Sequence, residues 1–344
     1  MEINPSQTSG REVGPSASPW RSKLRDSAYR LLWNAQERRL RLVPRLAIGI
    51  ALVSLLGILL GWVGGNALLE RAGRLWGAPG WVAVRGLSRL LAILLGTTLA
   101  ARFLDRRPFG AFGFHLGWGW WLDLGFGLAL GALLMTGIFL AERGAGWVTI
   151  TRTMAADADG LPFAPAFLGA LVLFICVSIY EELYARGYVL RNLAEGLRFG
   201  PFLARGGVVL AWLFSSVAFG LAHRNNPNTS SASTANLILA GLFLGLGYVL
   251  TGELAISIGL HITWNLFQGN VFGFPVSGLT LGPYFIATAQ RGPELWTGGP
   301  FGPEAGLIGI LAMWVGSLAV LAWVRLRHGR IILQTRLAEP PRRG

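Results

Sequence analysis

Three apolar stretches of this chain carry polar side chains that could do chemistry. The first contains the adjacent carboxylates Glu181 and Glu182, the second ends in His223, and the third contains His261 and Asn265. Ionisable groups are costly inside a bilayer and by default mark function. A glutamate in an apolar pocket suits a general base that activates water, and a His and an Asn can donate hydrogen bonds to an oxyanion. The set therefore suits the hydrolysis of a peptide bond.

Helical spacing divides these side chains into groups that face the same way. Residues four apart share a helix face, so Glu182 can pair with Arg186, whereas Glu181 points about 100° away from Glu182. Two further pairs share a face at this spacing: Phe219 with His223, and His261 with Asn265. We therefore expect one carboxylate to be neutralised by its own helix while Glu181 faces a cavity shared with the imidazoles and the amide.

Two modes of water activation remain open. Glu181 alone could act as the base, or Glu181, His223 and His261 could together hold Zn²⁺, which lowers the pKa of bound water. The ordinary zinc-protease signature, His-Glu-x-x-His, is absent from the sequence. The single cysteine, Cys176, excludes an intramolecular disulfide framework and a multi-cysteine metal site.

Each of these residues has an ordinary structural explanation when it is taken alone. A Glu-Glu pair at a helix end is commonly an interfacial charge pair, and a single intramembrane histidine is commonly a packing residue. The chain has only four histidines, however, and the other two, His115 and His328, lie in basic segments. Both remaining histidines fall in apolar spans, one of them with an asparagine on the same face, which favours a shared functional site.

The composition indicates which elements must position these residues. Hydrophobic residues make up 53% of the chain and charged residues 14%, against about a quarter in soluble domains. Stretches long enough to span a bilayer as helices recur, and the alternating pattern of a membrane barrel is not visible. We therefore predict an all-α, polytopic transmembrane bundle of about eight helices. The predicted spans are 46–69, 85–104, 119–141, 164–185, 206–223, 235–250, 254–270 and 304–324.

The basic residues are distributed as in a membrane protein rather than in a nucleic-acid-binding one, although the net charge is +13. With eight spans, 22 Lys and Arg residues fall on the side of the two termini and six on the opposite side. The side richer in Lys and Arg is normally cytoplasmic. We therefore expect a multi-pass plasma-membrane protein with both termini in the cytoplasm and no nucleic-acid partner.

Three regions follow from this pattern. Residues 1–44 form a basic tail. Apolar residues recur in it at helical spacing: Trp20, Leu24, Ala28, Leu31 and Ala35. We therefore expect this segment to lie on an anionic membrane face, with a solvated basic tail as the alternative. Residues 45–326 form the transmembrane domain, with its motif core at about 164–270. Residues 327–344 form a basic cytoplasmic tail.

The three polar segments resemble the motifs of the CPBP family of intramembrane proteases, also called the CAAX prenyl protease and bacteriocin-processing, or Abi, family. That family has the motifs Glu-Glu-x-x-x-Arg, Phe-x-x-x-His and His-x-x-x-Asn/Asp, and all three occur here in family order. The resemblance covers about residues 100–270. Residues 241–278 are similar to a bacterial branch of the family. The first 100 residues have no matching motif.

The resemblance implies an intramembrane endopeptidase and a role for each matching residue. Glu181 would activate the water, with His223 assisting or contacting it, and His261 and Asn265 would form the oxyanion hole. Glu182 and Arg186 would brace the site, and Phe219 belongs to the second motif. Ala185 departs from the pattern, because the family usually has an aromatic residue before the Arg. The expected substrate is a peptide or membrane-anchored protein in a bacterium.

Two other classes of function compete with the protease. A proton-coupled transporter would use the intramembrane Glu and His as a relay, and it predicts broken helices and paired repeats. A non-catalytic scaffold could keep the fold without the chemistry. One difficulty concerns depth, since simple antiparallel helices place His223 near the outer face and His261 nearer the cytoplasm. We predict that the helix boundaries are wrong and that the two histidines share one site.

Overall fold

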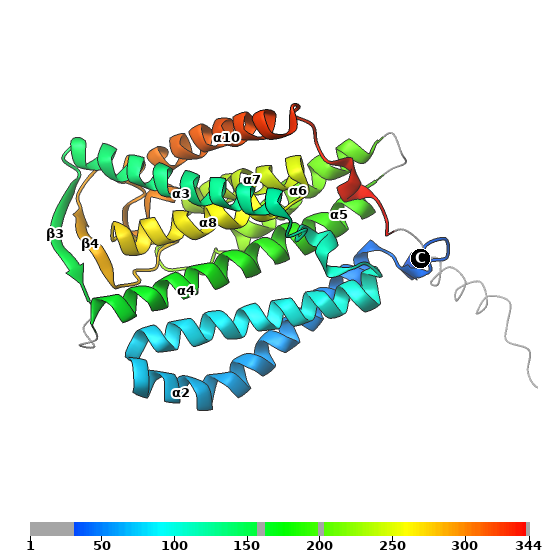
Figure 1. Cartoon of the computed structure of the whole chain (residues 1–344), viewed down its shortest axis with the longest axis horizontal. Helices are drawn as coiled ribbons and strands as arrows, with labels where there is room; N and C mark the ends of the chain where they lie inside the picture. The colour runs from blue at the N-terminus through cyan, green and yellow to red at the C-terminus, as the bar shows by residue number, and fades with distance from the viewer. Residues whose placement is uncertain (1–30, 157–161, 199–202, 342–344) are drawn as a thin grey trace, which may run out of the picture.

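The computed structural model describes residues 31–156, 162–198 and 203–341, without the side chains of residues 62–82. Its long helices lie side by side and form a bundle (Figure 1). The prediction of an all-α, polytopic bundle is confirmed. Among the described residues, seven helical segments are long and apolar enough to cross a membrane: Leu42–Gly61, Ala83–Asp105, Trp118–Gly144, Phe163–Gly196, Ala204–Ala222, Ser231–Thr251 and Leu307–His328.

The first two spans belong to one helix that folds back on itself. Helix α2 (Leu42–Leu99) continues into the π-helical segment η1 (Ala100–Asp105), and Figure 1 shows two adjacent antiparallel runs. The runs approach closely, because a Cβ atom on Gly96 would lie only 2.6 Å from Val53 Cγ2. The first two predicted spans therefore form a helical hairpin that packs on the rest of the bundle.

Helix α8 (Ala255–Leu266) is the shortest of the predicted spans and lies inside the bundle. It has 12 residues and continues into a π-helical turn, η5 (Phe267–Val271), so it is shorter than a full span although its position matches the predicted 254–270. All of its residues except Asn265 are buried. A helix enclosed by protein is not required to present a full bilayer length of apolar surface. Three helices pack against it: α3 (Trp118–Gly144), α4 (Phe163–Glu182) and α7 (Ser231–Thr251).

Glycines bring α3 and α8 into close contact. A Cβ atom on Gly127 would lie 2.4 Å from the Ile256 carbonyl oxygen, and one on Gly259 would lie 2.3 Å from the Leu124 carbonyl oxygen. Small residues allow helix backbones to approach in this way inside membranes. This contact fixes the rotation of α8, which determines where its polar residues point.

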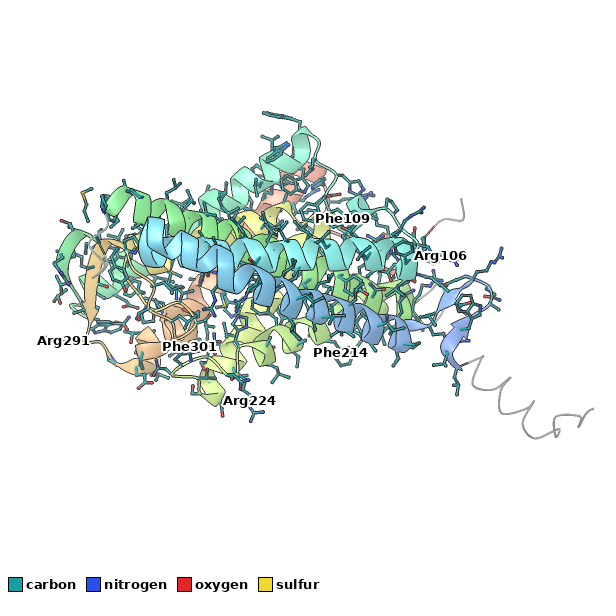
Figure 2. All side chains as sticks on the ribbon, turned by 90° about the horizontal axis from the view of Figure 1, so that it is seen from below. Arg106, Phe109, Phe214, Arg224, Arg291 and Phe301 are labelled. Carbon is teal, nitrogen blue, oxygen red and sulfur yellow. The ribbon has the colours of Figure 1, made fainter. Side chains whose placement is uncertain are left out.

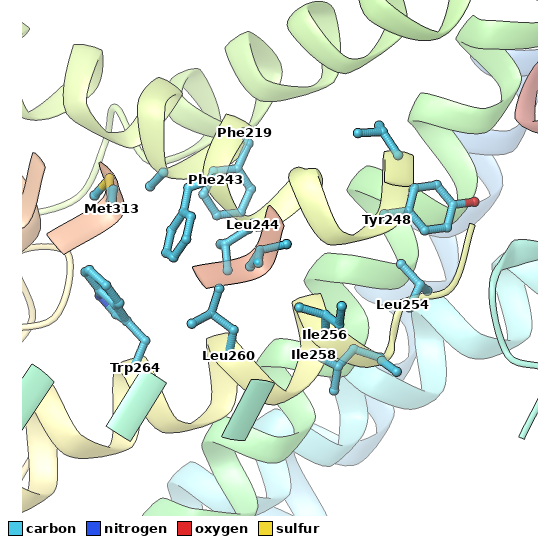
Figure 3. Packing of buried hydrophobic residues seen from close by; sticks show 14 of the residues in the cluster. Phe219, Phe243, Leu244, Tyr248, Leu254, Ile256, Ile258, Leu260, Trp264 and Met313 are labelled. Atoms are coloured by element: carbon cyan, nitrogen blue, oxygen red, sulfur yellow. The ribbon is translucent and has the colours of Figure 1, made fainter. Parts of the chain in front are cut away.

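The core lies between α7 and α8. Figure 3 shows Leu260 and Trp264 of α8 beside Phe243 and Leu244 of α7. The rings of Phe243 and Trp264 meet edge to face, with centroids 6.0 Å apart. Aromatic pairs of this geometry add specificity to apolar burial. The packing holds the motif-bearing helices in one arrangement.

The remaining helices agree with the predicted spans within about one turn, with one exception. Helix α4 runs without a break through the π-helical segment η3 (Leu183–Leu190) into α5 (Arg191–Gly196), well beyond the predicted end at residue 185. At the start of α7, Ser230 and Ser233 form a reciprocal capping box. The other two long helices are α6 (Ala204–Ala222) and α10 (Leu307–His328).

Two small antiparallel sheets were not predicted. Strand β1 (Trp33–Asn34) pairs with β2 (Arg39–Leu40), and β3 (Val148–Ala155) pairs with β4 (Tyr284–Gln290). The larger sheet closes one end of the bundle (Figure 1). Short helical turns fill the loops: η2 (Phe109–Phe112), α9 (Glu294–Thr297), η6 (Gly299–Phe301), η7 (Pro303–Ala305) and η8 (Thr335–Ala338).

The two ends of the described chain lie together at the end opposite the larger sheet (Figure 1). Figure 2 shows Arg106 at this end and Arg291 at the sheet end. Parts of both predicted tails pack on the bundle, since Arg39, Leu337 and Ala338 are buried. The predicted membrane-surface stripe begins at Trp20, and its residues before Leu31 lie outside the described residues.

Candidate active site

The paired glutamates lie where α4 changes its helical geometry. Glu181 and Glu182 are the last two residues of the α-helical segment, and the π-helical segment η3 begins at Leu183. Similarly, α8 passes into the π-helical η5 two residues after Asn265. π-helical turns are rare and are frequent at functional sites. Both helices therefore widen directly next to the predicted site residues.

Glu182 is the buried centre of the site. Its Oε1 accepts a hydrogen bond from Arg186 Nη1 at 2.9 Å, which is the predicted pairing within one helix, and lies 2.9 Å from His261 Nδ1 on α8. The side chains of Glu182 and Arg186 are fully buried. A carboxylate can accept several hydrogen bonds, so it joins the two helices and orients the imidazole.

Arg186 extends the buried group to two more helices. Its Nη2 donates a hydrogen bond to the Gly241 carbonyl oxygen of α7 at 2.9 Å. Its guanidinium carbon lies 4.5 Å from the centroid of the Phe219 ring on α6, a cation–π contact. One ion pair therefore fixes α4, α6, α7 and α8 around the same point.

His223 directly follows the last residue of α6 and is half-buried. Its Nδ1 lies 2.8 Å from the Phe219 carbonyl oxygen. Since a carbonyl can only accept, Nδ1 carries the hydrogen, and in the neutral ring Nε2 is a free acceptor. The Phe219 ring lies 4.8 Å from the His223 ring and 6.4 Å from the His261 ring, so both histidines contact one aromatic side chain.

Glu181 is the carboxylate left for chemistry. Its side chain is 23% exposed, and its Oε2 lies 4.0 Å from His261 Nε2. It makes no hydrogen bond to any residue that the structure describes, and the same holds for the Asn265 amide. A cavity of about 660 Å³ is lined by five of the predicted residues: Glu181, Phe219, His223, His261 and Asn265.

The expected difference in depth does not separate the two histidines, although the predicted error in the helix boundaries is wrong, since α6 begins at Ala204 and α8 at Ala255, close to the predicted starts. His223 lies just beyond the end of α6, and His261 is the seventh residue of α8, yet both line the same cavity. The structure therefore brings all seven residues of the predicted set together. Five line the cavity, while Glu182 and Arg186 lie behind His261 as support.

The arrangement separates the two carboxylates by environment. Glu182 is buried and neutralised by Arg186, whereas Glu181 is open to the cavity, bonds no Lys or Arg side chain that the structure describes, and lies 4.0 Å from His261 Nε2. A carboxylate in this position can accept a proton from water. His223 Nε2 and the Asn265 amide offer the cavity an acceptor and a donor, respectively. The site has the components for water activation and oxyanion stabilisation.

The side chains do not fit a zinc site in their present positions. Among the described residues, no group of three or more His, Cys, Asp and Glu side chains is placed to hold a metal ion. The expected ligands Glu181 and His261 lie 4.0 Å apart between Oε2 and Nε2, and no third His, Cys, Asp or Glu side chain among the described residues completes a set with them. No chemical step is therefore derived through a metal.

Three charged residues that line the cavity were not recognised as site residues from the sequence: Arg85, Arg89 and Glu304. Burial raises the pKa of the Glu304 carboxyl to about 7, although hydrogen bonds from Ser277 and Gln268 oppose the shift. Glu304 is the first residue of the predicted span 304–324, next to a Gly- and Pro-rich loop, and no spacing connects it with the three motifs. The two arginines were visible only as an imperfect start to the second span.

The fold and the cavity define a multi-pass helical membrane protein with a buried site of glutamate, histidine and asparagine side chains. Residues 163–267 match the family model described as Rce1-like, type II CAAX prenyl endopeptidase Rce1-like. The chain thus contains an Rce1-like domain over α4 to α8, and the resemblance carried by the three motifs is confirmed. Comparisons with curated proteins and with solved structures gave no match.

Proposed function

We propose that this protein is an intramembrane endopeptidase in which Glu181 activates the attacking water. The family match supports endopeptidase activity in a membrane. The observation that carries the mechanism is the difference between the two glutamates, since Glu182 is buried and bonded to Arg186 while Glu181 faces the cavity with His261 Nε2 4.0 Å from its Oε2. A carboxylate that is not held by an arginine and that reaches the cavity is available to take a proton from water.

The proposed reaction gives one role to each of four residues that line the cavity: Glu181, His223, His261 and Asn265. Glu181 takes one proton from water, whose oxygen attacks the scissile carbonyl carbon, while His223 Nε2 accepts a hydrogen bond from the O–H that remains on that oxygen. The carbonyl becomes an oxyanion that accepts hydrogen bonds from the Asn265 amide and from His261 Nε2 when that ring is protonated. The tetrahedral intermediate then collapses, its carbon–nitrogen bond breaks, and Glu181 returns its proton to the leaving amine.

The proposed substrate is a peptide or a membrane-anchored protein that reaches the cavity within the bilayer of a bacterial plasma membrane. We also propose that both termini are cytoplasmic. The shared location of the two described ends and the 22 to 6 excess of basic residues support this orientation.

The test is cleavage of a quenched fluorescent peptide library by the purified full-length protein in vesicles. We expect turnover by the wild type and its loss in Glu181→Gln and His223→Ala. Glu294→Gln and His328→Ala make the same chemical changes at exposed positions outside the cavity and serve as matched controls. Activity that survives in Glu181→Gln would refute the proposed base.

The same preparation separates the competing functions. A transporter predicts proton flux that requires Glu181 in a protein that cleaves nothing, and a scaffold predicts neither activity. Zinc assistance predicts bound metal in the purified protein and inhibition by a chelator that added Zn²⁺ reverses. Full turnover in metal-free protein would leave Glu181 as the sole activator.

A further inference from the structure

We propose that Arg85 and Arg89 form a subsite for a carboxylate of the substrate peptide, beside the reacting centre. This inference rests on the proposed endopeptidase function. Both arginines are exposed and line the cavity that contains Glu181. They belong to α2, outside the segment that matches the family model.

The helical turn of α2 that carries Arg85 and Arg89 packs on α4 near Glu181. A Cβ atom on Gly86 would lie 3.2 Å from Leu173 Cδ1 and 3.4 Å from Cys176 Cβ, so α2 packs tightly on α4 here. One turn further along, the Arg89 side chain interacts with Tyr180, the neighbour of Glu181. The two guanidinium groups therefore follow α4 towards the site.

Arg85 and Arg89 lack the carboxylate partner that the buried Arg186 has. Arg186 has a carboxylate partner at 2.9 Å. Neither Arg85 nor Arg89 forms an ion pair with any residue that the structure describes. A guanidinium without a carboxylate partner is available to bind an anion. Two of them one helical turn apart, facing a cavity, can bind an anionic group from two sides.

The cavity favours a peptide carboxylate over a lipid phosphate as the anion. Arginines that only anchor a helix extend to the outer lipid surface, whereas these two line the same cavity as His223 and Asn265. Gly86 packs on Leu173 and Cys176, which precede Glu181 on α4 by eight and five residues. At ~1.5 Å per residue, this separation is roughly 8–12 Å along the helix. An extended peptide covers that distance in about two to four residues at ~3.3 Å each.

The expected substrate is therefore an apolar peptide with a carboxylate about two to four residues from the cleaved bond. Two sources supply that chemistry: the carboxyl terminus of the peptide, or an Asp or Glu side chain. The carboxylate would anchor the peptide so that the scissile carbonyl lies between Glu181 and Asn265.

The test measures binding in full-length Glu181→Gln protein, so that it does not depend on turnover. The probes are one fluorescent apolar peptide in three forms: a free carboxyl terminus, an amidated terminus, and an amidated terminus with one internal Asp. The protein is reconstituted in phosphatidylcholine vesicles and again in vesicles containing phosphatidylglycerol. We expect the amide to bind at least about tenfold more weakly than a carboxylate form, and the two carboxylate forms identify the source.

Adding Arg85→Gln with Arg89→Gln should remove that difference and leave binding of the amide unchanged. Arg85→Lys with Arg89→Lys keeps the charges and should restore part of the preference, which separates charge from folding. Arg291→Gln, an exposed arginine outside the cavity, is the control.

Two results would overturn the subsite. Equal loss of acid and amide binding in the Gln variants would show a packing role, and an effect that appears only with phosphatidylglycerol would show a lipid contact. If the wild type cleaves nothing but the carboxylate preference is present and needs both arginines, the proposed function fails while the subsite stands.

Discussion

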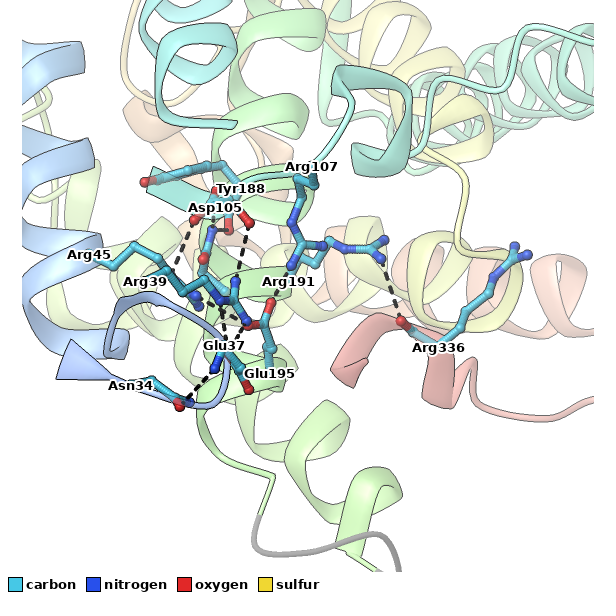
Figure 4. A network of polar contacts seen from close by, with 11 residues as sticks. Asn34, Glu37, Arg39, Arg45, Asp105, Arg107, Tyr188, Arg191, Glu195 and Arg336 are labelled. Atoms are coloured by element: carbon cyan, nitrogen blue, oxygen red, sulfur yellow. Dashed lines mark hydrogen bonds and ion pairs between the residues drawn. The ribbon is translucent and has the colours of Figure 1, made fainter. Parts of the chain in front are cut away.

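The protein contains two buried groups of charged side chains, one at each of two depths in the bundle. At the end of the bundle where the first and last described residues lie, Glu195 bonds three arginines: Arg39 and Arg45 through Oε1, and Arg107 through Oε2 (Figure 4). At the candidate active site, Glu182 bonds Arg186 and His261. Both groups join segments that are far apart in the sequence, and both centre on a carboxylate.

The two groups differ in what they leave unpaired. In the terminal network the carboxylates are surrounded by arginines, and burial lowers the pKa of Arg39 to about 10 and that of Arg107 to about 9. At the site, a second carboxylate lies next to the paired one and faces a cavity. The comparison indicates that the first group serves architecture, whereas the site adds an available carboxylate to a similar framework.

The largest effect is expected from removing that available carboxylate. Glu181→Gln keeps the side-chain size but cannot take a proton, so we expect kcat to fall by about 10²- to 10⁴-fold. Because Glu181 makes no hydrogen bond to a described residue, the free energy of unfolding should change by less than about 0.5 kcal/mol. Peptide cleavage and thermal unfolding in the same detergent measure both quantities. A large loss of stability would contradict the division between the two groups.

The reverse result is expected for the terminal network. Glu195→Gln leaves three buried arginines without a shared carboxylate, which should lower the free energy of unfolding by about 3–5 kcal/mol. Turnover per folded molecule should be retained, because Glu195 does not line the cavity. Chemical denaturation and active-site-normalised cleavage test this prediction. Glu339→Gln, a glutamate in the C-terminal segment, provides the control.

Glu304 is a third kind of buried carboxylate, with hydrogen bonds but no cation. Its Oε1 accepts from the Ser277 backbone N–H at 2.5 Å, and its Oε2 accepts from Gln268. Because its pKa is raised from 4.5 to about 7 by burial, the folded protein holds this proton more tightly than the unfolded chain. Stability from the neutral form is therefore complete below pH 4.5 and is lost as the pH rises to about 7.

We expect this change to amount to about 3 kcal/mol across that interval. Glu304→Gln mimics the neutral carboxyl and should remove this part of the pH dependence of unfolding. Thermal unfolding measured from pH 4 to pH 8 checks the prediction. An unchanged pH profile in the variant would show that the pKa of Glu304 is the same in the folded protein and in the unfolded chain.

The sequence was sufficient to predict the long apolar helices and the seven residues of the three motifs that the structure brings together. Apolar runs marked every span, and four-residue spacing predicted the pairing of Glu182 with Arg186. It was not sufficient for contacts between helices, such as that of Glu182 with His261, because spacing within one helix does not determine the rotation of another. The π-helical segments η3 and η5 were missed because one extra residue per turn has no signature in hydrophobic periodicity.

The smallest effect is expected at Phe219, which belongs to the supporting framework although its ring also lines the cavity. Phe219→Leu keeps an apolar side chain but removes the ring 4.5 Å from the Arg186 guanidinium. The lost cation–π contact should lower stability by about 1 kcal/mol. Because the same ring contacts both histidines, kcat should fall by roughly tenfold, far less than in Glu181→Gln. Phe214→Leu, on the exposed face of α6 (Figure 2), is the matched control. If Phe219→Leu lowered activity as strongly as Glu181→Gln with no change in stability, the ring would belong with the reacting groups instead of the framework.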